Sequence, residues 1–353
     1  MKTITFVLPG YSRVPIGGYK MVFEYANYLV KKNKVNILFL NDNALNKYPV
    51  PNIIKRKVID HFTQIEPNWF KLNKNINKIS GRSKNIDKVF VTSDVVIATA
   101  ATTANYVNNN FQNSKKFYFI QDFENWEMSS NELFNTYKMN FTDIVVSHWL
   151  EDIVKKYSKT IPIYIQNPID ISKYKINTPI EKRDKFTVGM LYHVRPTKGS
   201  KYTLAALKEV KKTIPQLNVK VFGATKKPAN LPEWMEYYEN ASQEETINIY
   251  NSISTFVNGT IEEGFGLTGL EAMACGATLV STNYLGVREY AINEKNALLS
   301  SIKNVEELKN NVVRVLKNDN LRIRLAKEGN KKAQDFSLKN ACTKFQNIVT
   351  SED

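Results

Sequence analysis

The stretch EEGFGLTGLEAMACGA, residues 262–277, places two carboxylates on either side of a glycine-rich turn. Seven residues separate Glu263 from Glu271. The run STFVNGT (254–260) before the turn has the apolar, β-branched character of a strand, whereas the residues after it are small and apolar. This order predicts a strand, then a loop that carries Glu263, then a helix that begins near residues 267–268.

The turn has the features of an anion site. Glycines at 264 and 266 let the backbone approach a ligand closely, and the free N–H groups at the start of the next helix favour an anion such as diphosphate. Glu271, about one turn into the helix, can accept hydrogen bonds from a ribose diol. Glu263 would contact a sugar at the other end of the ligand. The residues of the motif that are predicted to bind this ligand are Gly264, Phe265, Gly266, Leu267, Thr268 and Glu271.

Short apolar runs alternate with amphipathic stretches along the whole chain, as in ITFVLPG (4–10) followed by YKMVFEYANYLVKK (19–32). The runs predicted as strands are residues 4–10, 34–41, 93–100, 116–122, 143–148, 161–167, 186–193, 218–223, 254–260 and 278–282. Near-continuous apolar strands between helices are typical of parallel sheets that are covered on both faces. The polar, proline-bearing run YKINTPIEKRDK (174–185) interrupts the alternation. The pattern therefore predicts two doubly wound, Rossmann-like α/β domains that face each other across a cleft, over residues 1–173 and 186–335, joined by a linker over 174–185.

The composition excludes several classes of protein. The 353 residues include two cysteines and three histidines, too few and too scattered for a zinc site. No apolar run approaches the roughly 20 residues that a membrane span needs, so we expect a cytoplasmic protein. The net charge of +15 favours phosphate-bearing or anionic-lipid partners. Nucleic acid is not expected, because the charge is diffuse and no nucleic-acid-binding motif is present.

The whole string, with Ala272, Met273, Ala274 and Gly276 after Glu271 and with NYLGVRE (283–289) further on, resembles the signature of retaining glycosyltransferases of family four, which have the GT-B fold. Thr278 stands where that family has proline. The resemblance implies that the N-terminal domain binds the acceptor and the C-terminal domain binds a nucleotide sugar. It also implies that the C-terminal helix, 336–353, packs back on the N-terminal domain.

The resemblance extends to MLYHVRPTKGS (190–200), where the family carries a basic pair that neutralises the donor diphosphate. Lys198 matches the family's lysine. His193 stands at the family's arginine position, and Arg195 follows two residues later as the replacement cation. Lys198, Arg195 and Glu263 are therefore expected to be catalytic, and His193 to bind the donor. Cationic charge is needed there because negative charge builds on the diphosphate as the sugar leaves.

Two N-terminal segments resemble other parts of the family pattern. In PGYSRVPIGGYK (9–20), Gly17 and Gly18 would bring backbone amides near the donor. The segment YFIQDFENW (118–126) resembles a bacterial subgroup that builds cell-surface polysaccharides. Many family members have a histidine there that touches the donor sugar. Among Gln121, Asp122 and Glu124 at that place, Asp122 is expected to be catalytic, as an acceptor-side or sugar contact; the alternative is that it only caps the next turn.

The segment 69–88 mixes six basic residues with Trp69, Phe70, Leu72, Ile76 and Ile79. It either docks on anionic lipid or a lipid-linked acceptor, which would place the protein peripherally on the inner face of the cell membrane, or forms a solvated loop. Both interpretations stay open at this stage.

The predicted function is transfer of a sugar from a nucleoside diphosphate sugar, with UDP-hexose or UDP-N-acetylhexosamine favoured, to a hydroxyl of a glycan or lipid-linked acceptor. No cofactor or metal is expected, since the chain contains no Asp-x-Asp motif. The alternatives are a dTDP-rhamnose-dependent rhamnosyltransferase, a GT-B-like epimerase or phosphorylase, and a non-catalytic partner subunit with the same fold.

Overall fold

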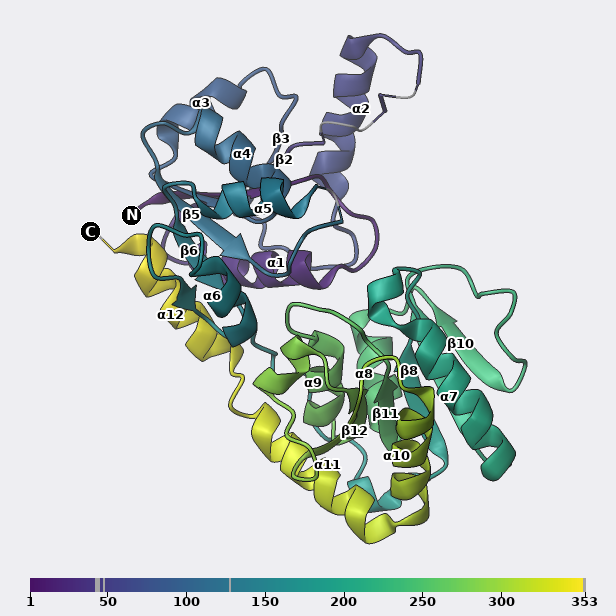
Figure 1. The fold of residues 1–353 in the computed structure, drawn as a ribbon. Coiled ribbons are helices and arrows are strands. Elements are labelled where there is room, and N and C mark those ends of the chain that lie inside the picture. The colour runs from purple at the N-terminus through teal and green to yellow at the C-terminus, as the bar shows by residue number, and fades with distance from the viewer. Residues whose placement is uncertain (42–44, 47, 127, 352–353) are drawn as a thin grey trace. The chain divides into compact units, whose positions relative to one another are not determined.

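The structure of the protein is a computed structural model that describes residues 1–41, 45–46, 48–126 and 128–351. The chain divides into two compact units (Figure 1). Unit 1 contains Met1–Gln166 and Lys339–Asp353, and unit 2 contains Asn167–Leu338. Each unit is an α/β structure with its own sheet.

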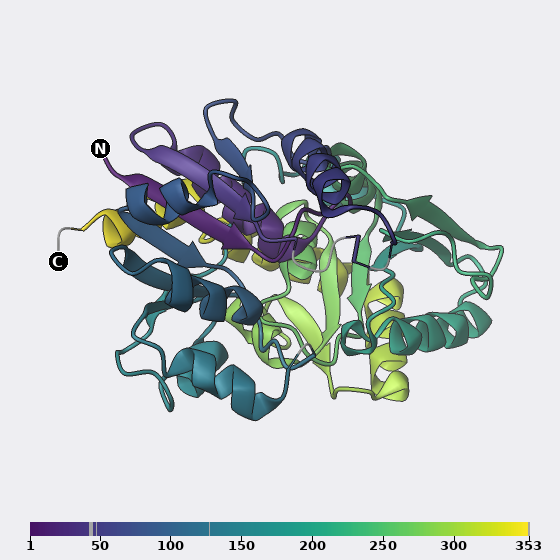
Figure 2. The same cartoon turned by 90° about the horizontal axis from the view of Figure 1, so that it is seen from above.

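Unit 1 is built on a parallel sheet whose described strands follow the order β3-β2-β1-β4-β5-β6-β7. In Figure 2 the purple strands of this sheet run side by side and in the same direction. The central strand TITFVL is buried along nearly its whole length, as expected where helices cover both faces. The strands are β1 (Thr3–Leu8), β2 (Lys34–Phe39), β3 (Asn77–Ser80), β4 (Val95–Ala98), β5 (Lys115–Ile120), β6 (Thr142–Val145) and β7 (Ile163–Tyr164).

Helices cover both faces of this sheet. On one face the aromatic rings of Tyr25, Phe119 and Phe345 pack with their centroids within 6 Å of one another. These contacts join α1 and α12 to β5. The last helix, α12, thus belongs to the core of unit 1. The helices of the unit are α1 (Gly17–Leu29), α2 (Asn52–Ile65), α3 (Ile86–Thr92), α4 (Ala101–Asn110), α5 (Ser130–Tyr137), α6 (His148–Val154) and α12 (Leu338–Thr350).

Unit 2 is built on a second parallel sheet, in the order β10-β9-β8-β11-β12-β13 among the described residues. Its strands are short and mostly buried. TLVST, for example, is buried at every position. The strands are β8 (Thr187–Leu191), β9 (Asn218–Gly223), β10 (Met235–Glu239), β11 (Thr255–Asn258), β12 (Thr278–Thr282) and β13 (Ala297–Ser300).

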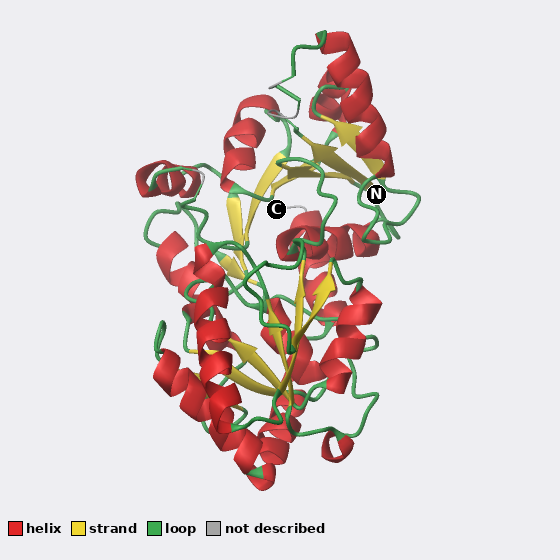
Figure 3. Ribbon diagram, turned by 90° about the vertical axis from the view of Figure 1, so that its right-hand side faces the viewer, coloured by secondary structure: helices red, strands yellow, loops and turns green. Residues whose placement is uncertain are grey.

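The helices of unit 2 also lie on both sides of their sheet, so that the strands form an inner layer (Figure 3). One apolar core joins α7 and α10 to the sheet through Leu207, Val219 and Val312. The helices are α7 (Ser200–Thr213), α8 (Gln243–Ser252), α9 (Leu267–Ala274), α10 (Val305–Lys317) and α11 (Asp319–Ala333).

The predicted fold class is confirmed, since both sheets are parallel and both units are doubly wound α/β structures. The predicted cleft between the two domains stays a prediction. Three strands lie outside the predicted runs: β3, β10 and β13, each at an edge of its sheet. The segment 174–185, predicted as a linker, lies within unit 2 and includes a short 3-10 helix, Ile180–Lys182.

Candidate functional site

The predicted donor-site residues of the C-terminal half gather at one point of the unit 2 sheet. The chain crosses from β8 to β9 on one side, and it returns to β11 on the other side of β8. The loops after β8 and β11 therefore leave neighbouring strands in opposite directions. Ligands of open parallel sheets bind at such a switch point, outside the carboxyl ends of the strands. Lys198 lies in the first loop and Glu263 in the second.

The two loops are held together by backbone contact. Gly199 has φ of 63°, in the left-handed region, and a Cβ at this position would overlap the carbonyl oxygen of Gly259. Two backbone N–H groups of the second loop, those of Ile261 and Glu262, donate to the carbonyl oxygen of Thr197 at 2.8 and 3.2 Å. The relative positions of the two loops are thus fixed by main-chain atoms.

The central contact of the site is an ion pair between Lys198 Nζ and Glu263 Oε1. The side chains of Lys198 and Glu263 are only 17% and 19% exposed. Partial burial strengthens the attraction above that of a surface pair. The sequence predicted both residues as catalytic, and the structure brings them into direct contact.

His193 is held as a neutral hydrogen-bond donor. Its Nδ1 accepts a hydrogen bond from the backbone N–H of Arg195 at 3.0 Å, which leaves the proton of the neutral ring on Nε2. The pKa of His193 is lowered, first by burial and then by the positive charges of Lys198 and Arg195. His193 therefore adds a donor to this loop, and the positive charge comes from Lys198 and Arg195.

The glycine-rich turn precedes α9, an eight-residue helix. Gly266 has φ of 96°, and a Cβ there would overlap the hydroxyl of Tyr284. The hydroxyl of Tyr290 donates to the carbonyl oxygen of Gly266 at 2.6 Å. The first turn contains only Leu267, Thr268 and Gly269, and no described side chain caps it. Its N–H groups and the positive end of the helix dipole are therefore available to an anion.

Two motif residues lie deeper than their predicted roles suggest. The ring of Phe265 is buried and packs 5.6 Å from Tyr290 and 5.9 Å from Phe336, so the side chain belongs to the interior of unit 2. Glu271 is 6% exposed and accepts a hydrogen bond from the hydroxyl of Tyr250 at 3.3 Å. Ribose binding by Glu271 stays a prediction, and it would use the part of the carboxylate that is not directed at Tyr250.

Sequence reasoning missed Arg183, which binds the C-terminal end of α9. Its buried guanidinium donates to the carbonyl oxygens of Thr178, Tyr250, Ile253 and Cys275, at 2.6 to 3.2 Å. Burial lowers the pKa of Arg183 to about 10. Because Cys275 is the C-cap of α9, this arginine ties the segment 174–185 to the C-terminal end of that helix. A single arginine in a polar run gives no pattern from which this could be predicted.

The remaining predicted residues lie in unit 1, at the carboxyl ends of β1 and β5. Gly17 and Gly18 begin α1, and a Cβ on Gly18 would lie 3.3 Å from Nε2 of Gln121. Asp122 accepts a hydrogen bond from the backbone N–H of Phe123 at 3.0 Å. The carboxylate of Glu124 accepts from the backbone N–H of Ala101, the first residue of α4, at 2.6 Å. This edge of unit 1 therefore carries acids beside a glycine pair.

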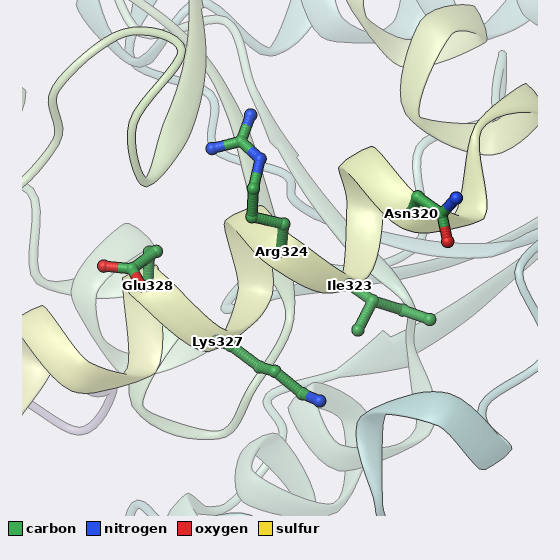
Figure 4. Close-up of a pocket in the computed structure, with 5 residues that line it drawn as sticks. All are labelled: Asn320, Ile323, Arg324, Lys327 and Glu328. Atoms are coloured by element: carbon green, nitrogen blue, oxygen red, sulfur yellow. The ribbon is translucent and has the colours of Figure 1, made fainter.

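Other features of the described residues do not compete with this site. No group of three or more His, Cys, Asp or Glu side chains there is placed to hold a metal ion. A surface pocket on α11 is lined by side chains that leave one helix in different directions (Figure 4). Two of its residues are already engaged: Lys327 pairs with Glu181, and Arg324 donates to the carbonyl oxygen of Glu294. None of the helices in the described part of the chain is long and apolar enough to cross a membrane.

Comparisons with known proteins show which chains and folds this protein is similar to. Residues 173–332 match the family described as Glycosyl transferases group 1. An uncharacterized glycosyltransferase of Methanocaldococcus jannaschii is 26% identical over 150 residues, which are 40% of this chain and 41% of that protein. An uncharacterized glycosyltransferase of Haemophilus influenzae is 20% identical over 360 residues, which cover 96% of this chain and 90% of that protein.

Among solved structures, HepE of Anabaena, in complex with UDP and glucose, superposes with a TM-score of 0.76 at 14% identity and covers 99% of this chain and 100% of HepE. Two parallel α/β units of this kind define the GT-B class of fold. Within that class, residues 173–332 match the model of the glycosyl transferases group 1 family. The resemblance predicted from the motif is thereby confirmed.

Proposed function

We propose that this protein transfers a sugar from a nucleoside diphosphate sugar to a hydroxyl of a glycan or lipid-linked acceptor in the synthesis of bacterial surface polysaccharides. The favoured donors are UDP-hexose and UDP-N-acetylhexosamine, followed by dTDP-rhamnose. The observation that carries the proposal is the ion pair between Lys198 and Glu263 at the switch point of unit 2. The open N-terminus of α9 lies on the loop that carries Glu263.

In the proposed reaction the bond between the anomeric carbon and the phosphate oxygen breaks, and a bond to the acceptor oxygen forms. The proton of the acceptor hydroxyl leaves with the diphosphate or passes to solvent. Lys198, Arg195 and the N–H groups at the start of α9 stabilise the charge that builds on the departing diphosphate. These groups supply the compensating positive charge, so the proposal includes no metal ion. Retention at the anomeric carbon is part of the proposal on the basis of the family resemblance.

The ion pair gives Glu263 a second role. In the structure each partner neutralises the charge of the other. We infer that the diphosphate takes over Lys198 when the donor binds, while the sugar hydroxyls take over Glu263. After transfer the sugar hydroxyls are gone, so Glu263 again competes with the diphosphate for Lys198. The exchange favours donors that carry a sugar and promotes release of the nucleotide.

Three observations support the choice of donor and its location. Lysine and helix N-termini are suited to phosphate groups. The switch point of an open parallel sheet is the usual place for nucleotides. The structure of HepE, which has the same fold, was determined with UDP and glucose, and this makes UDP the first nucleotide to test.

The exchange can be tested by calorimetric titration of UDP and of UDP-sugars into wild type and Glu263→Gln. The substitution removes the competing charge, so free UDP should bind more tightly, by about fivefold for a partly exposed ion pair. Turnover should fall by about a hundredfold or more, because the sugar loses an acceptor that orients it. If Glu263→Gln weakens the binding of UDP, the proposed exchange is wrong.

A non-catalytic role has one observation in its favour, since an ion pair between Lys198 and Glu263 would also serve as a structural contact. Thermal-shift measurements with a panel of nucleoside diphosphates and their sugars separate the two functions. A nucleotide that binds the native state raises the melting temperature by mass action. The enzyme proposal expects a shift with a nucleotide sugar that Glu271→Ala abolishes. A wild-type protein that responds to no nucleotide would favour the non-catalytic role.

A further inference from the structure

Two buried tyrosines lie against the glycine-rich turn that precedes α9. Tyr284 and Tyr290 are 0% and 1% exposed, and their hydroxyl oxygens are 3.2 Å apart. Tyr284 lies within the run NYLGVRE (283–289), and Tyr290 follows that run directly. A buried hydroxyl group is retained at little cost only where it has a hydrogen-bond partner. The partners of these two therefore indicate what the pair does.

The two hydroxyl groups reach the backbone of the turn because glycines stand opposite them. A Cβ on Gly266 would overlap the hydroxyl of Tyr284. A Cβ on Gly269 would lie 2.5 Å from the hydroxyl of Tyr290. A side chain at either position would displace a tyrosine from the interior of unit 2. The first turn of α9 and the tyrosine pair are thus fitted to each other.

The hydroxyl protons of the pair have a fixed order. Tyr290 donates to the carbonyl oxygen of Gly266 at 2.6 Å, and this bond uses its only proton. The hydroxyl of Tyr284 is therefore the donor to Oη of Tyr290. Burial raises the pKa of both tyrosines, so both hydroxyl groups keep their protons. Tyr290 is a permanent donor to Gly266, and Tyr284 polarises that donor.

The bond from Tyr290 fixes the direction of an amide at the start of α9. The carbonyl of Gly266 and the N–H of Leu267 belong to one planar, trans peptide unit and point in opposite directions. Because the carbonyl faces the buried tyrosine, the N–H faces the other way. Gly266 and Gly269 are buried, whereas Leu267 and Thr268 are partly exposed. The N–H of Leu267 is one of the amides at a helix start that favour an anion.

A glycine at this place needs such a restraint. Gly266 has φ of 96°, and glycine adopts several backbone conformations at similar energy. Without the bond from Tyr290, rotation of the peptide unit would turn the carbonyl oxygen of Gly266 toward the anion and the N–H of Leu267 away from it. The partial negative charge of the oxygen would then repel a phosphate group.

We propose that Tyr290 is a positioning residue of the donor site, whose hydroxyl holds the carbonyl of Gly266 toward the interior and so directs the N–H of Leu267 at the β-phosphate of the nucleotide. The inference rests on the proposed function, whose site also includes Lys198 and Glu263. Tyr284 acts on the same bond through Tyr290. Since the amide concerned binds a phosphate oxygen, the effect should be larger for a nucleoside diphosphate than for a monophosphate.

Calorimetric titration of UDP and of UMP into wild type and Tyr290→Phe tests the inference. The substitution removes the hydroxyl and keeps the ring. UDP should bind about tenfold more weakly to the variant, as expected when one hydrogen bond to a charged group is lost. UMP, which lacks the β-phosphate, should change by less than about twofold. Tyr284→Phe should weaken UDP binding by only about twofold, because Tyr290 still donates to Gly266.

Tyr237→Phe is the matched control. The hydroxyl of Tyr237 also donates to a backbone carbonyl of unit 2, that of Thr225, at 2.6 Å. This control should leave the ratio of the UDP and UMP affinities as in wild type, and melting curves should show that all variants are folded.

The outcomes separate this inference from the proposed function. A Tyr290→Phe variant that binds UDP as tightly as wild type would overturn the role of Tyr290 and leave the proposed function intact. Equal losses for UDP and UMP would also overturn it, because they would show general damage to unit 2. A wild type that binds no nucleoside diphosphate would contradict the proposed function and the inference together.

Discussion

The carboxyl edges of the two sheets share one topology but differ in the charged side chains that the sequence predicted to bind ligand. In unit 2 the loops at the switch point carry Lys198 and Arg195, with Glu263 paired to the lysine. In unit 1 the corresponding edge carries Asp122 and Glu124. Cations suit a diphosphate, whereas carboxylates accept hydrogen bonds from hydroxyl groups. The proposed function uses this contrast, with the donor at the edge of unit 2 and the acceptor at the edge of unit 1.

The two edges also differ in how they are fixed. In unit 2 the loops meet through backbone, with Gly199 against Gly259 and Gly266 beneath Tyr284. In unit 1 the nearest atoms to Gly18 belong to the flexible side chain of Gln121. We therefore expect Gly199 and Gly266 to tolerate almost no added side chain, and Gly18 to tolerate a small one more readily.

The largest effect should come from Lys198→Ala, which removes the cation nearest to the predicted diphosphate. We expect kcat/KM for sugar transfer to fall by about a thousandfold, in the range seen when one group that stabilises a developing anion is removed. Lys201→Ala is the control, because Lys201 is an exposed lysine three residues away. If both variants lose activity equally, the cationic edge of unit 2 is not the donor site.

The interiors of the two units should respond differently to pH. Burial raises the pKa of Asp143 in unit 1 from 3.8 to about 7. The native state therefore holds a proton that the unfolded state loses, so the stability from this group is present below about pH 4 and is lost as the pH rises through 7. The full change is about 4 kcal/mol at most. Arg183 in unit 2 stays charged over that range.

Denaturant unfolding of unit 1, followed from pH 4 to pH 8, measures this difference. Wild type should lose stability as the pH rises. In Asp143→Asn the carboxyl group is gone, so the free energy of unfolding should be nearly independent of pH. Arg183 stays charged from pH 4 to pH 8, so it adds no pH dependence in either protein. An unchanged slope in Asp143→Asn would show that another group controls the stability of unit 1.

A somewhat smaller effect should separate the glycines of the two edges. Gly199→Ala places a Cβ against the carbonyl of Gly259 at a positive φ, and we expect a loss of about 3 kcal/mol in the free energy of unfolding of unit 2. Gly18→Ala should cost about 1 kcal/mol or less, because the side chain of Gln121 can move. Chemical denaturation of both variants tests the difference, and equal losses would contradict it.

The smallest effect should come from His193. His193→Ala removes one neutral hydrogen-bond donor, for which we expect about a tenfold loss of kcat/KM. Because the pKa of His193 is lowered, its contribution should be constant around neutral pH. As the pH falls through the lowered pKa, Nδ1 gains a proton and can no longer accept from the backbone N–H of Arg195, so the contact that orients the Nε2–H donor is lost. A pH–rate profile should show this decrease of kcat/KM at low pH in wild type and not in His193→Gln.

The sequence predicted the central strands and the site loops because both have strong local signals. β1 and β12 are almost entirely buried, and their apolar runs are correspondingly clear. The missed strands β3, β10 and β13 lie at sheet edges, where half of the backbone faces solvent or a loop. NKIS and MEYYE therefore mix polar and apolar residues as loops do.

At the site, the sequence brought Lys198 and Glu263 together only through the family resemblance. Their direct contact depends on Gly199 and Gly259, which are 60 positions apart and meet through tertiary packing. The burial of Phe265 and the role of Arg183 were also beyond local patterns. Both depend on partners such as Phe336 and Cys275, which no spacing rule connects to them.

A crystal structure of the chain with UDP would test the central claim most directly. The proposed mechanism expects the β-phosphate within hydrogen-bonding distance of Lys198 Nζ and of the N–H groups that begin α9, with the contact between Lys198 and Glu263 broken or lengthened. A UDP bound away from this switch point, with that ion pair intact, would contradict it.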